Sequence, residues 1–195
     1  TSALSFGGRL INNSISQTNE SWNGTSWSEV GDLNSGNHDI AGGAGVSNTS
    51  ALCFGGDPSN SATNESWNGT AWTEVANLNA VTSQQAGIGT ATAALSVGGY
   101  APPSSTRQAK NESWNGSSWT ELADMNTTRN GFGGAGRTTG AIVFGGDNPG
   151  GNPITVNAEL WNGSSWTEVA NISVASALNG GAGASNQLAI NFGGI

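Results

Sequence analysis

The sequence predicts an all-β protein, a β-propeller of four blades with four antiparallel strands each and one surplus strand. Three recurring elements carry this prediction: a motif with two tryptophans, an apolar run closed by paired glycines, and a stretch of small residues. All three recur together, and periods of about 40 to 50 residues with several short strands are typical of propeller blades. We treat residues 1–195 as a single domain, which suits a chain of 195 residues.

The tryptophan motif, Glu-Ser-Trp-Asn-Gly-Thr-Ser-Trp in its first copy, predicts a hairpin in each repeat. An Asn-Gly pair favours a two-residue turn of type I′, because that turn needs positive φ at both central residues. Such a turn pairs Trp22 with Thr25 and Glu20 with Trp27, so both tryptophans share one face. We expect all eight tryptophans to be buried between blades. The first tryptophans of the copies are Trp22, Trp67, Trp114 and Trp161.

The other two elements supply the remaining strands. The run closed by paired glycines occurs five times and the small-residue stretch four times, which with the hairpins gives 17 strands, whereas four blades need 16. We expect the glycine-rich strand at 180–184 to complete the blade begun by 1–30, so that either 1–8 or 188–194 is surplus. An unpaired surplus strand favours association, so a homo-oligomer through it is one expected assembly. The repeat units are 1–33, 34–78, 79–125 and 126–172, followed by a closing segment, 173–195.

Composition excludes several classes of function. Charged residues make up 9% of the chain and the net charge is −8, with five cationic side chains in all. Nucleic acid is therefore not an expected partner, because affinity for phosphates needs clustered Lys and Arg. No apolar run approaches the roughly 18 residues of a membrane span. Cys53 is the single cysteine, so an intrachain disulfide is impossible, and we expect it to be a small core residue.

The order of these elements resembles the kelch repeat, and the resemblance covers essentially the whole chain. A glycine-containing strand is followed by an apolar run, paired glycines, an aromatic residue and a final tryptophan. The sequence departs from the family because Trp22 and its three equivalents stand where kelch repeats usually carry Tyr. The chain is also similar to kelch-like arrays of marine bacteria and their viruses, which implies an extracellular or virion-associated protein.

The repeats leave little that could perform chemistry. Eight of the thirteen carboxylates occupy two positions that recur in every copy of the motif, so the blade itself explains them. His38 is the only histidine and has no motif around it, and we interpret it as a solvated loop residue. Asp57 and Asp147 follow paired glycines and suit turns better than calcium binding. We therefore expect no enzyme, no catalytic residue, no metal and no cofactor.

Divergence between the repeats indicates where a partner would bind. The turns between third and fourth strands are nearly identical, whereas the connections after second and fourth strands differ, and both of these emerge on one face. Loops vary freely and also carry function. The sequence thus favours a structural or interaction module, an adhesin or virion component, that binds a protein or glycan at this face. A lectin with sugar sites repeated in each blade is the alternative, and a glycoside hydrolase is a further one. The candidate binding residues are Arg9, His38, Tyr100, Arg107, Lys110 and Arg129.

Overall fold

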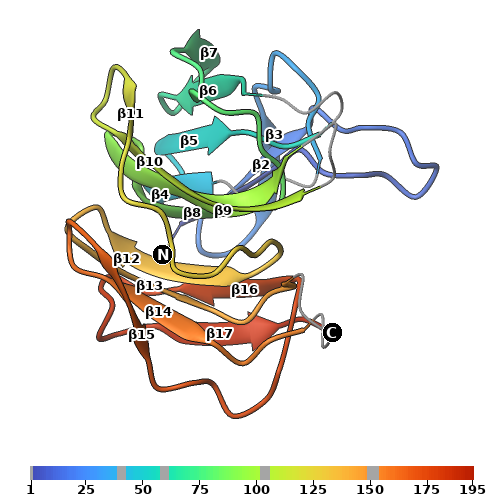
Figure 1. Ribbon diagram of the computed structural model, residues 1–195. Helices are drawn as coiled ribbons and strands as arrows, with labels where there is room; N and C mark the ends of the chain where they lie inside the picture. The colour runs from blue at the N-terminus through green and yellow to red at the C-terminus, as the bar shows by residue number, and fades with distance from the viewer. Residues whose placement is uncertain (1, 39–42, 58–61, 102–105, 149–153) are drawn as a thin grey trace.

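The computed structural model describes residues 2–38, 43–57, 62–101, 106–148 and 154–195, and its regular elements are strands throughout (Figure 1). The described part of the chain contains 17 strands, the number that the sequence predicts, and every pairing between them is antiparallel. This arrangement confirms the all-β propeller class. Within the described residues, no helix has the length and apolar character needed to cross a membrane.

The strands form five sheets that follow one another along the chain. Blade 1 has three strands, β1 (Ala3–Phe6), β2 (Asn19–Trp22) and β3 (Trp27–Val30). Blade 2 contains β4 (Gly43–Ser47), β5 (Ser50–Phe54), β6 (Asn64–Trp67) and β7 (Trp72–Val75). Blade 3 contains β8 (Ala86–Thr90), β9 (Ala93–Ala101), β10 (Thr106–Trp114) and β11 (Trp119–Glu121).

Two further sheets complete the chain. Blade 4 contains β12 (Gly133–Arg137), β13 (Gly140–Phe144), β14 (Ala158–Trp161) and β15 (Trp166–Val169). The terminal sheet contains only β16 (Asn179–Ala182) and β17 (Ile190–Gly193). In Figure 1, blades 2 and 3 lie above, and blade 4 lies below with the terminal sheet.

The small-residue strands β4, β8, β12 and β16 lie side by side around the axis of the propeller. Their glycines allow this close approach. A Cβ on Gly181 would lie 2.5 Å from the backbone nitrogen of Gly134 on the neighbouring strand. Side chains at such positions would force the inner strands apart, so the repeated small residues are explained by packing.

The hairpin turn differs from the predicted one by one residue. Trp22 lies directly opposite Trp27, so the pairing of Trp22 with Thr25 was wrong. The backbone N–H of Asn23 donates to the Ser26 carbonyl at 3.2 Å, which makes Gly24 and Thr25 the two turn residues. Of these only Gly24 has a positive φ, 102°, which fits a turn with glycine in its first central position. The Asn23 side-chain oxygen instead accepts hydrogen bonds from the backbone N–H groups of Thr25 and Ser26.

The predicted closure of the ring was also wrong. β16 pairs with β17, and no strand pairing among the described residues joins the terminal sheet to β1. Blade 1 therefore lacks an inner strand, while the terminal sheet lacks the outer hairpin that the other blades have. The propeller is open between these two sheets.

Successive blades are joined by hydrophobic clusters around the tryptophan pairs. Trp114 and Trp119 of blade 3, for example, pack in one cluster with Leu52 and Leu78 of blade 2. Six tryptophans are at most 7% exposed, which confirms the prediction of burial for blades 2, 3 and 4. It was wrong for blade 1, where Trp22 is half-buried and Trp27 is 48% exposed.

A buried carboxylate clamps each of these interfaces as well. Glu112 of blade 3 accepts hydrogen bonds from the backbone nitrogens of Asn79 and Ala80, at 2.9 and 3.0 Å, and from the Asn79 side chain at 2.8 Å. Asn79 and Ala80, which supply these three donor groups, lie in the connection that follows β7 of blade 2. The same clamp recurs at Glu65 with Asn34 and Ser35, and at Glu159 with Asn126 and Thr127.

Candidate functional site

A repeated backbone bridge builds the face on which the divergent connections emerge. The residue that follows each pair of glycines exchanges two backbone hydrogen bonds with the connection entering the same blade. The pairs are His38 with Asp57, Ser83 with Tyr100, and Asn130 with Asp147. We call these six residues, together with Arg9 at the equivalent position of blade 1, the rim. The three bridges hold their backbones alike, whereas Arg9 bridges Ile15. The side chains vary between blades except for the aspartate shared by positions 57 and 147, so the rim is a repeated scaffold with variable side chains.

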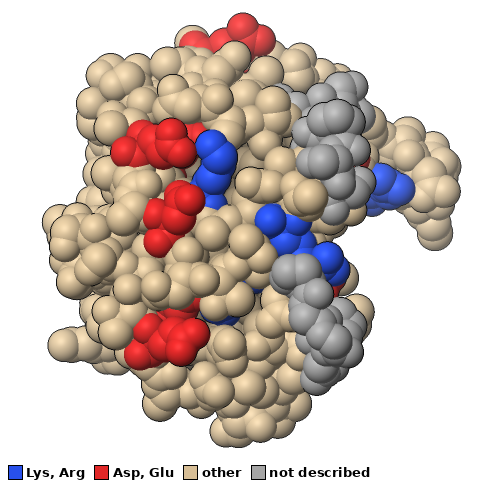
Figure 2. All heavy atoms as spheres, viewed as in Figure 1, with Lys and Arg blue, Asp and Glu red and all other residues tan. Residues whose placement is uncertain are grey.

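The cationic side chains of the rim face are held by partners. An Arg9 guanidinium nitrogen lies 3.1 Å from Nε2 of His38, and Arg107 forms an ion pair with Asp147 at 2.5 Å. Figure 2 shows Lys and Arg groups at the centre and right of the view and Asp and Glu groups mainly on the left, where a cationic group also lies beside them. The rim face therefore combines Arg9 and Arg107 with Asp57 and Asp147, so its charges are mixed on a protein whose net charge is −8.

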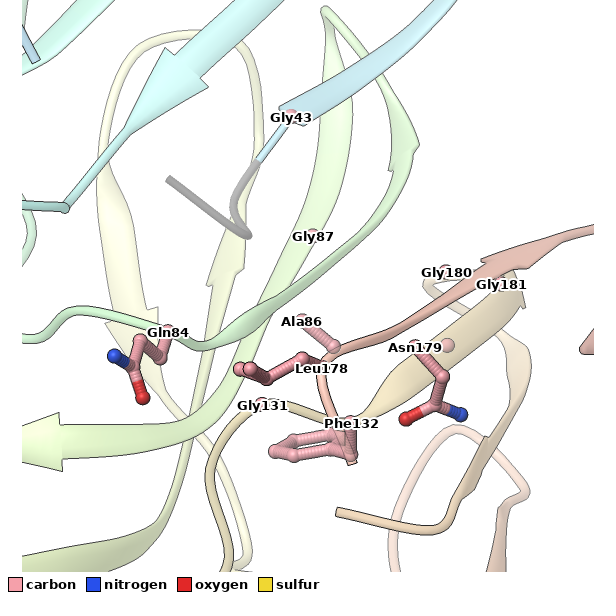
Figure 3. A pocket seen from close by; sticks show the side chains of 11 residues that line it. Gly43, Gln84, Ala86, Gly87, Gly131, Phe132, Leu178, Asn179, Gly180 and Gly181 are labelled. Atoms are coloured by element: carbon pink, nitrogen blue, oxygen red, sulfur yellow. The ribbon is translucent and has the colours of Figure 1, made fainter. Parts of the chain in front are cut away.

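A cavity of about 410 Å³ opens on the axis inside the rim (Figure 3). Most of its wall is glycine backbone from the inner strands, and the side chains it presents belong to Gln84, Ala86, Phe132, Leu178 and Asn179. None of its lining residues is titratable. The cavity offers amide groups and apolar surface, a combination that suits a neutral polar ligand group or an inserted side chain.

Three equivalent residues in the left-handed region form a belt at the mouth of this cavity. Gln84, Gly131 and Leu178 have φ values of 55°, 59° and 57°. The Leu178 N–H donates to the Gly131 carbonyl at 2.6 Å, and the Gly131 N–H donates to the Gln84 carbonyl at 2.9 Å. Figure 3 shows the Leu178 side chain lying over Gly131. A positive φ is strained for leucine and is most often found at functional sites.

The structure brings three predicted binding residues to the rim face. Arg9 is exposed, Tyr100 is half-buried, and Arg107 pairs with Tyr100 across β9 and β10. Both strands are nine residues long, so Tyr100 and Arg107 lie at the end of a sheet and not in a loop. Lys110 also lies within β10, where its ammonium group contacts Glu121 of β11 at 3.3 Å, away from the rim.

The other two predicted residues are buried, which corrects the interpretation that they are exposed. His38 is 4% exposed because its backbone forms a bridge and its ring lies against Arg9. Arg129 is fully buried and donates to Glu159 at 2.6 Å and to the carbonyls of Gly145 and Asn157. Burial lowers the pKa of Arg129 and the charge of Glu159 raises it, with burial the larger effect. Arg129 therefore joins blades and is not available to a partner.

Sequence reasoning missed Gln84 and Leu178 at the cavity mouth. The signal that could have found them is the position itself, which is Gln, Gly and Leu in successive repeats although the backbone there needs a positive φ. The carboxylates predicted to be turn residues, Asp57 and Asp147, instead lie in the rim bridges, and the Asp147 side chain forms an ion pair with Arg107. The described residues contain no group of three His, Cys, Asp or Glu side chains placed to hold a metal ion.

Comparisons with known proteins bear on the fold. No protein-family model and no curated protein matches the sequence. Among solved structures, the chain is similar to YjhT, a kelch-repeat propeller protein, with a TM-score of 0.78 and 14% sequence identity. The match covers 99% of this chain and 74% of the YjhT chain. This chain therefore has the β-propeller fold of a kelch-repeat protein, at an identity where the likeness speaks for the fold alone.

Proposed function

We propose that the chain is a non-enzymatic interaction module that binds a protein or glycan partner on its rim face, as an extracellular or virion component would. The observation that carries the proposal is the repeated bridge: His38 with Asp57, Ser83 with Tyr100, and Asn130 with Asp147 share one backbone geometry, while the first partner differs in every blade and the second is Asp, Tyr and Asp. A rigid scaffold that presents variable side chains is the usual basis of recognition by loops.

The chemistry of the face suggests how a partner is held. Tyr and Arg are enriched at binding hot spots, and Tyr100, Arg9 and Arg107 lie on this face. Leu178 is 61% exposed at the cavity mouth and supplies an apolar contact beside the amide of Gln84. A polar or anionic surface with one group that enters the cavity would match this arrangement.

The tryptophans support the rim over sugar sites repeated in each blade. A lectin that stacked sugars on them would need exposed rings at equivalent places in the blades. Trp67, Trp114 and Trp161 are at most 2% exposed, and each donates its indole N–H to a backbone carbonyl. Their faces are used in packing blades together, so the proposal places any glycan on the rim.

Two variants test the proposed face while leaving the fold intact. Leu178→Gly removes the leucine side chain from the mouth of the axial cavity. Because glycine adopts the φ of 57° at this position without strain, the free energy of unfolding should stay equal or rise. Combined with Tyr100→Ala, Leu178→Gly should abolish binding of ligands selected by the wild-type protein from arrayed glycans and displayed random peptides. Thr70→Ala, in an exposed turn of the opposite face, is the matched control. Ligands that survive the rim variant but are lost in the control would place the site on the wrong face.

The non-enzymatic part of the proposal has a separate test. Incubation of the wild-type protein with arrayed glycans, followed by mass spectrometry, should leave every glycan intact. Cleavage that persists after rigorous purification and is lost in a variant of a described carboxylate would replace the proposal by a hydrolase.

A further inference from the structure

The interface between successive blades occurs three times in the chain and always has two halves. The later blade supplies a pair of tryptophans and the clamp glutamate, and the earlier blade supplies aliphatic side chains and two backbone N–H groups. Between blades 2 and 3, Leu52 and Leu78 are at most 4% exposed under the tryptophans of blade 3. Each half is buried only because the other half covers it.

Blade 1 carries an unused copy of the later half. Trp27 is 48% exposed and Trp22 is half-buried, although their equivalents in blades 2, 3 and 4 are at most 7% exposed. Glu20 occupies the position of the clamp glutamates, yet it is exposed and accepts no hydrogen bond from any described residue.

Blade 4 carries an unused copy of the earlier half. Ile142 and Ile172 occupy the positions of Leu52 and Leu78 and are only half-buried. Ser173 and Val174 follow Ile172 as Asn79 and Ala80 follow Leu78, and their backbone N–H groups find no acceptor among the described residues. Val174 is also 74% exposed.

The sheet edges carry the same complementarity. Among the described residues, β1 pairs with no inner strand, and β16 is an inner strand that pairs with β17 alone. β1 and β17 are equivalent in sequence, Ala-Leu-Ser-Phe-Gly-Gly and Ala-Ile-Asn-Phe-Gly-Gly. Since Ala182 pairs with Ile190 of β17, the equivalent register on β1 pairs Ala182 with Leu4.

We propose that a second copy of this chain completes the open blade, with blade 1 of one copy taking the place of β17 on the terminal sheet of the other. The completed sheet has the order β16, β1, β2, β3. Trp22 and Trp27 then cover Ile142 and Ile172 of the other copy, and Glu20 accepts the N–H groups of Ser173 and Val174. The contact continues the interface that already joins the blades within one chain.

In this proposal β17 is displaced from its place beside β16, because its side chains are not buried against the rest of the protein. All four of its residues are exposed, including Phe192 at 54%. In β1, by contrast, Phe6 packs edge-to-face on Trp72, with ring centroids 5.0 Å apart, and Leu4 belongs to the cluster between blades 1 and 2. Loss of β17 from its slot therefore costs less buried surface than loss of β1.

A second copy fits better than closure within one chain. The two unused halves do not meet within one chain: β16 lies against β12 and β1 lies beside β4. Although β4 and β16 line the same axial cavity, no strand pairing among the described residues joins β16 to β1. The contact is head-to-tail, so copies associate either into a closed ring or into an open chain of blades. Of the rim, Arg9 adjoins this contact, because it follows β1 as Ile195 follows β17, and Ile195 exchanges backbone hydrogen bonds with Ala177. The variants that test the contact leave every rim residue unchanged, so failure of this proposal can be distinguished from failure of the proposed binding function.

Complementary variants test the head-to-tail contact. Glu20→Ala with Trp27→Ala disables the half on blade 1, and Val174→Glu disables the half on blade 4; all three side chains are exposed, so the fold should survive. In sedimentation, the wild-type mass should rise with concentration, and each variant alone should stay monomeric. An equimolar mixture restores one junction and should double the mass. Ser28→Ala, on the other face of the same hairpin, should behave as wild type.

Three results would overturn the proposal. The wild-type chain could remain monomeric at every concentration, the mixture could fail to associate, or either variant alone could associate as well as wild type. The first result together with Trp22 and Trp27 shielded from a fluorescence quencher would mean that one chain closes on itself.

An engineered disulfide tests the register. Residues directly opposite in antiparallel strands have Cα atoms about 4.5 to 5.5 Å apart, within the range that a disulfide spans. Leu4→Cys in one copy and Ala182→Cys in another should therefore form a covalent dimer on mixing under mild oxidation. Cys53 is only 3% exposed and should not compete. Absence of the cross-link in a mixture that does associate would show that β17 keeps its slot.

Discussion

Blade 1 and blade 3 contain nearly the same tryptophan hairpin and yet differ in how it is used. Trp119 of blade 3 is 7% exposed, and Glu112 accepts three hydrogen bonds from the preceding connection. In blade 1, Trp27 is 48% exposed and Glu20 accepts none from the described residues. Both hairpins have the same pairing, with the two tryptophans opposite each other. The motif therefore encodes the hairpin and one half of an interface, and the neighbouring blade decides whether that half is buried.

The clamp glutamates should show the largest difference. Glu159→Ala leaves the fully buried Arg129 without its counter-ion, and breaking a buried ion pair on one side typically costs about 3 to 5 kcal/mol. Glu20→Ala removes an exposed carboxylate and should change stability by less than about 0.5 kcal/mol. Urea unfolding of dilute, monomeric protein measures both. Similar losses for the two variants would mean that Glu20 is engaged within its own chain.

The tryptophans should show a smaller but still clear difference. Trp119→Ala opens the cluster between blades 2 and 3 and should cost about 3 kcal/mol. Trp27→Ala should cost about 1 kcal/mol at most, because Trp27 contacts mainly Trp22, with ring centroids 5.5 Å apart. Thermal and urea midpoints of the two variants give the comparison. If Trp27→Ala were as destabilising as Trp119→Ala, blade 1 would have a neighbour in the isolated chain.

The sequence repeat made the fold of each blade predictable, but it did not show how the two ends of the repeat array are paired. Strand number and blade content followed from periodicity, because each period contains the same turn and glycine signals. The turn register could not be read from Asn-Gly alone, since Asn23 caps the turn with its side chain and leaves the positive φ to Gly24. Closure depends on which free edges find partners in space, and two equivalent sequences, those of β1 and β17, competed for one slot.

The candidate site was predictable in part for a similar reason. The divergent connections did mark the face that carries Arg9, Tyr100 and Arg107. Charge alone misplaced Arg129, because a buried Arg is stable only beside a carboxylate that is itself buried, and Glu159 comes from a strand 30 residues away. The belt formed by Gln84 and Leu178 depends on backbone angles that composition does not show.

The last contrast, which has no effect at neutral pH, is between Cys53 of blade 2 and Ser5, its exposed equivalent in blade 1. Burial, with a further contribution from the charge of Glu65, raises the pKa of the Cys53 thiol from 9.0 to about 12. Between these pH values the unfolded thiol has lost a proton that the folded thiol keeps, so the folded state binds more protons. Stability should then fall with rising pH, by up to about 1.4 kcal/mol for each pH unit above 9.

Cys53→Ser isolates this effect from other groups that titrate at alkaline pH. Serine already occupies the equivalent buried position at Ser96, which is 4% exposed, so the variant should fold. Its stability should decline less steeply than that of the wild type as the pH rises from about 9. In Cys53→Ser with Ser5→Cys, the thiol lies on the exposed strand β1 and should react with a thiol reagent at about pH 8, where a thiolate is partly populated. Equal slopes for wild type and Cys53→Ser, or rapid labelling of native Cys53, would show that blade 2 opens at this strand as readily as blade 1.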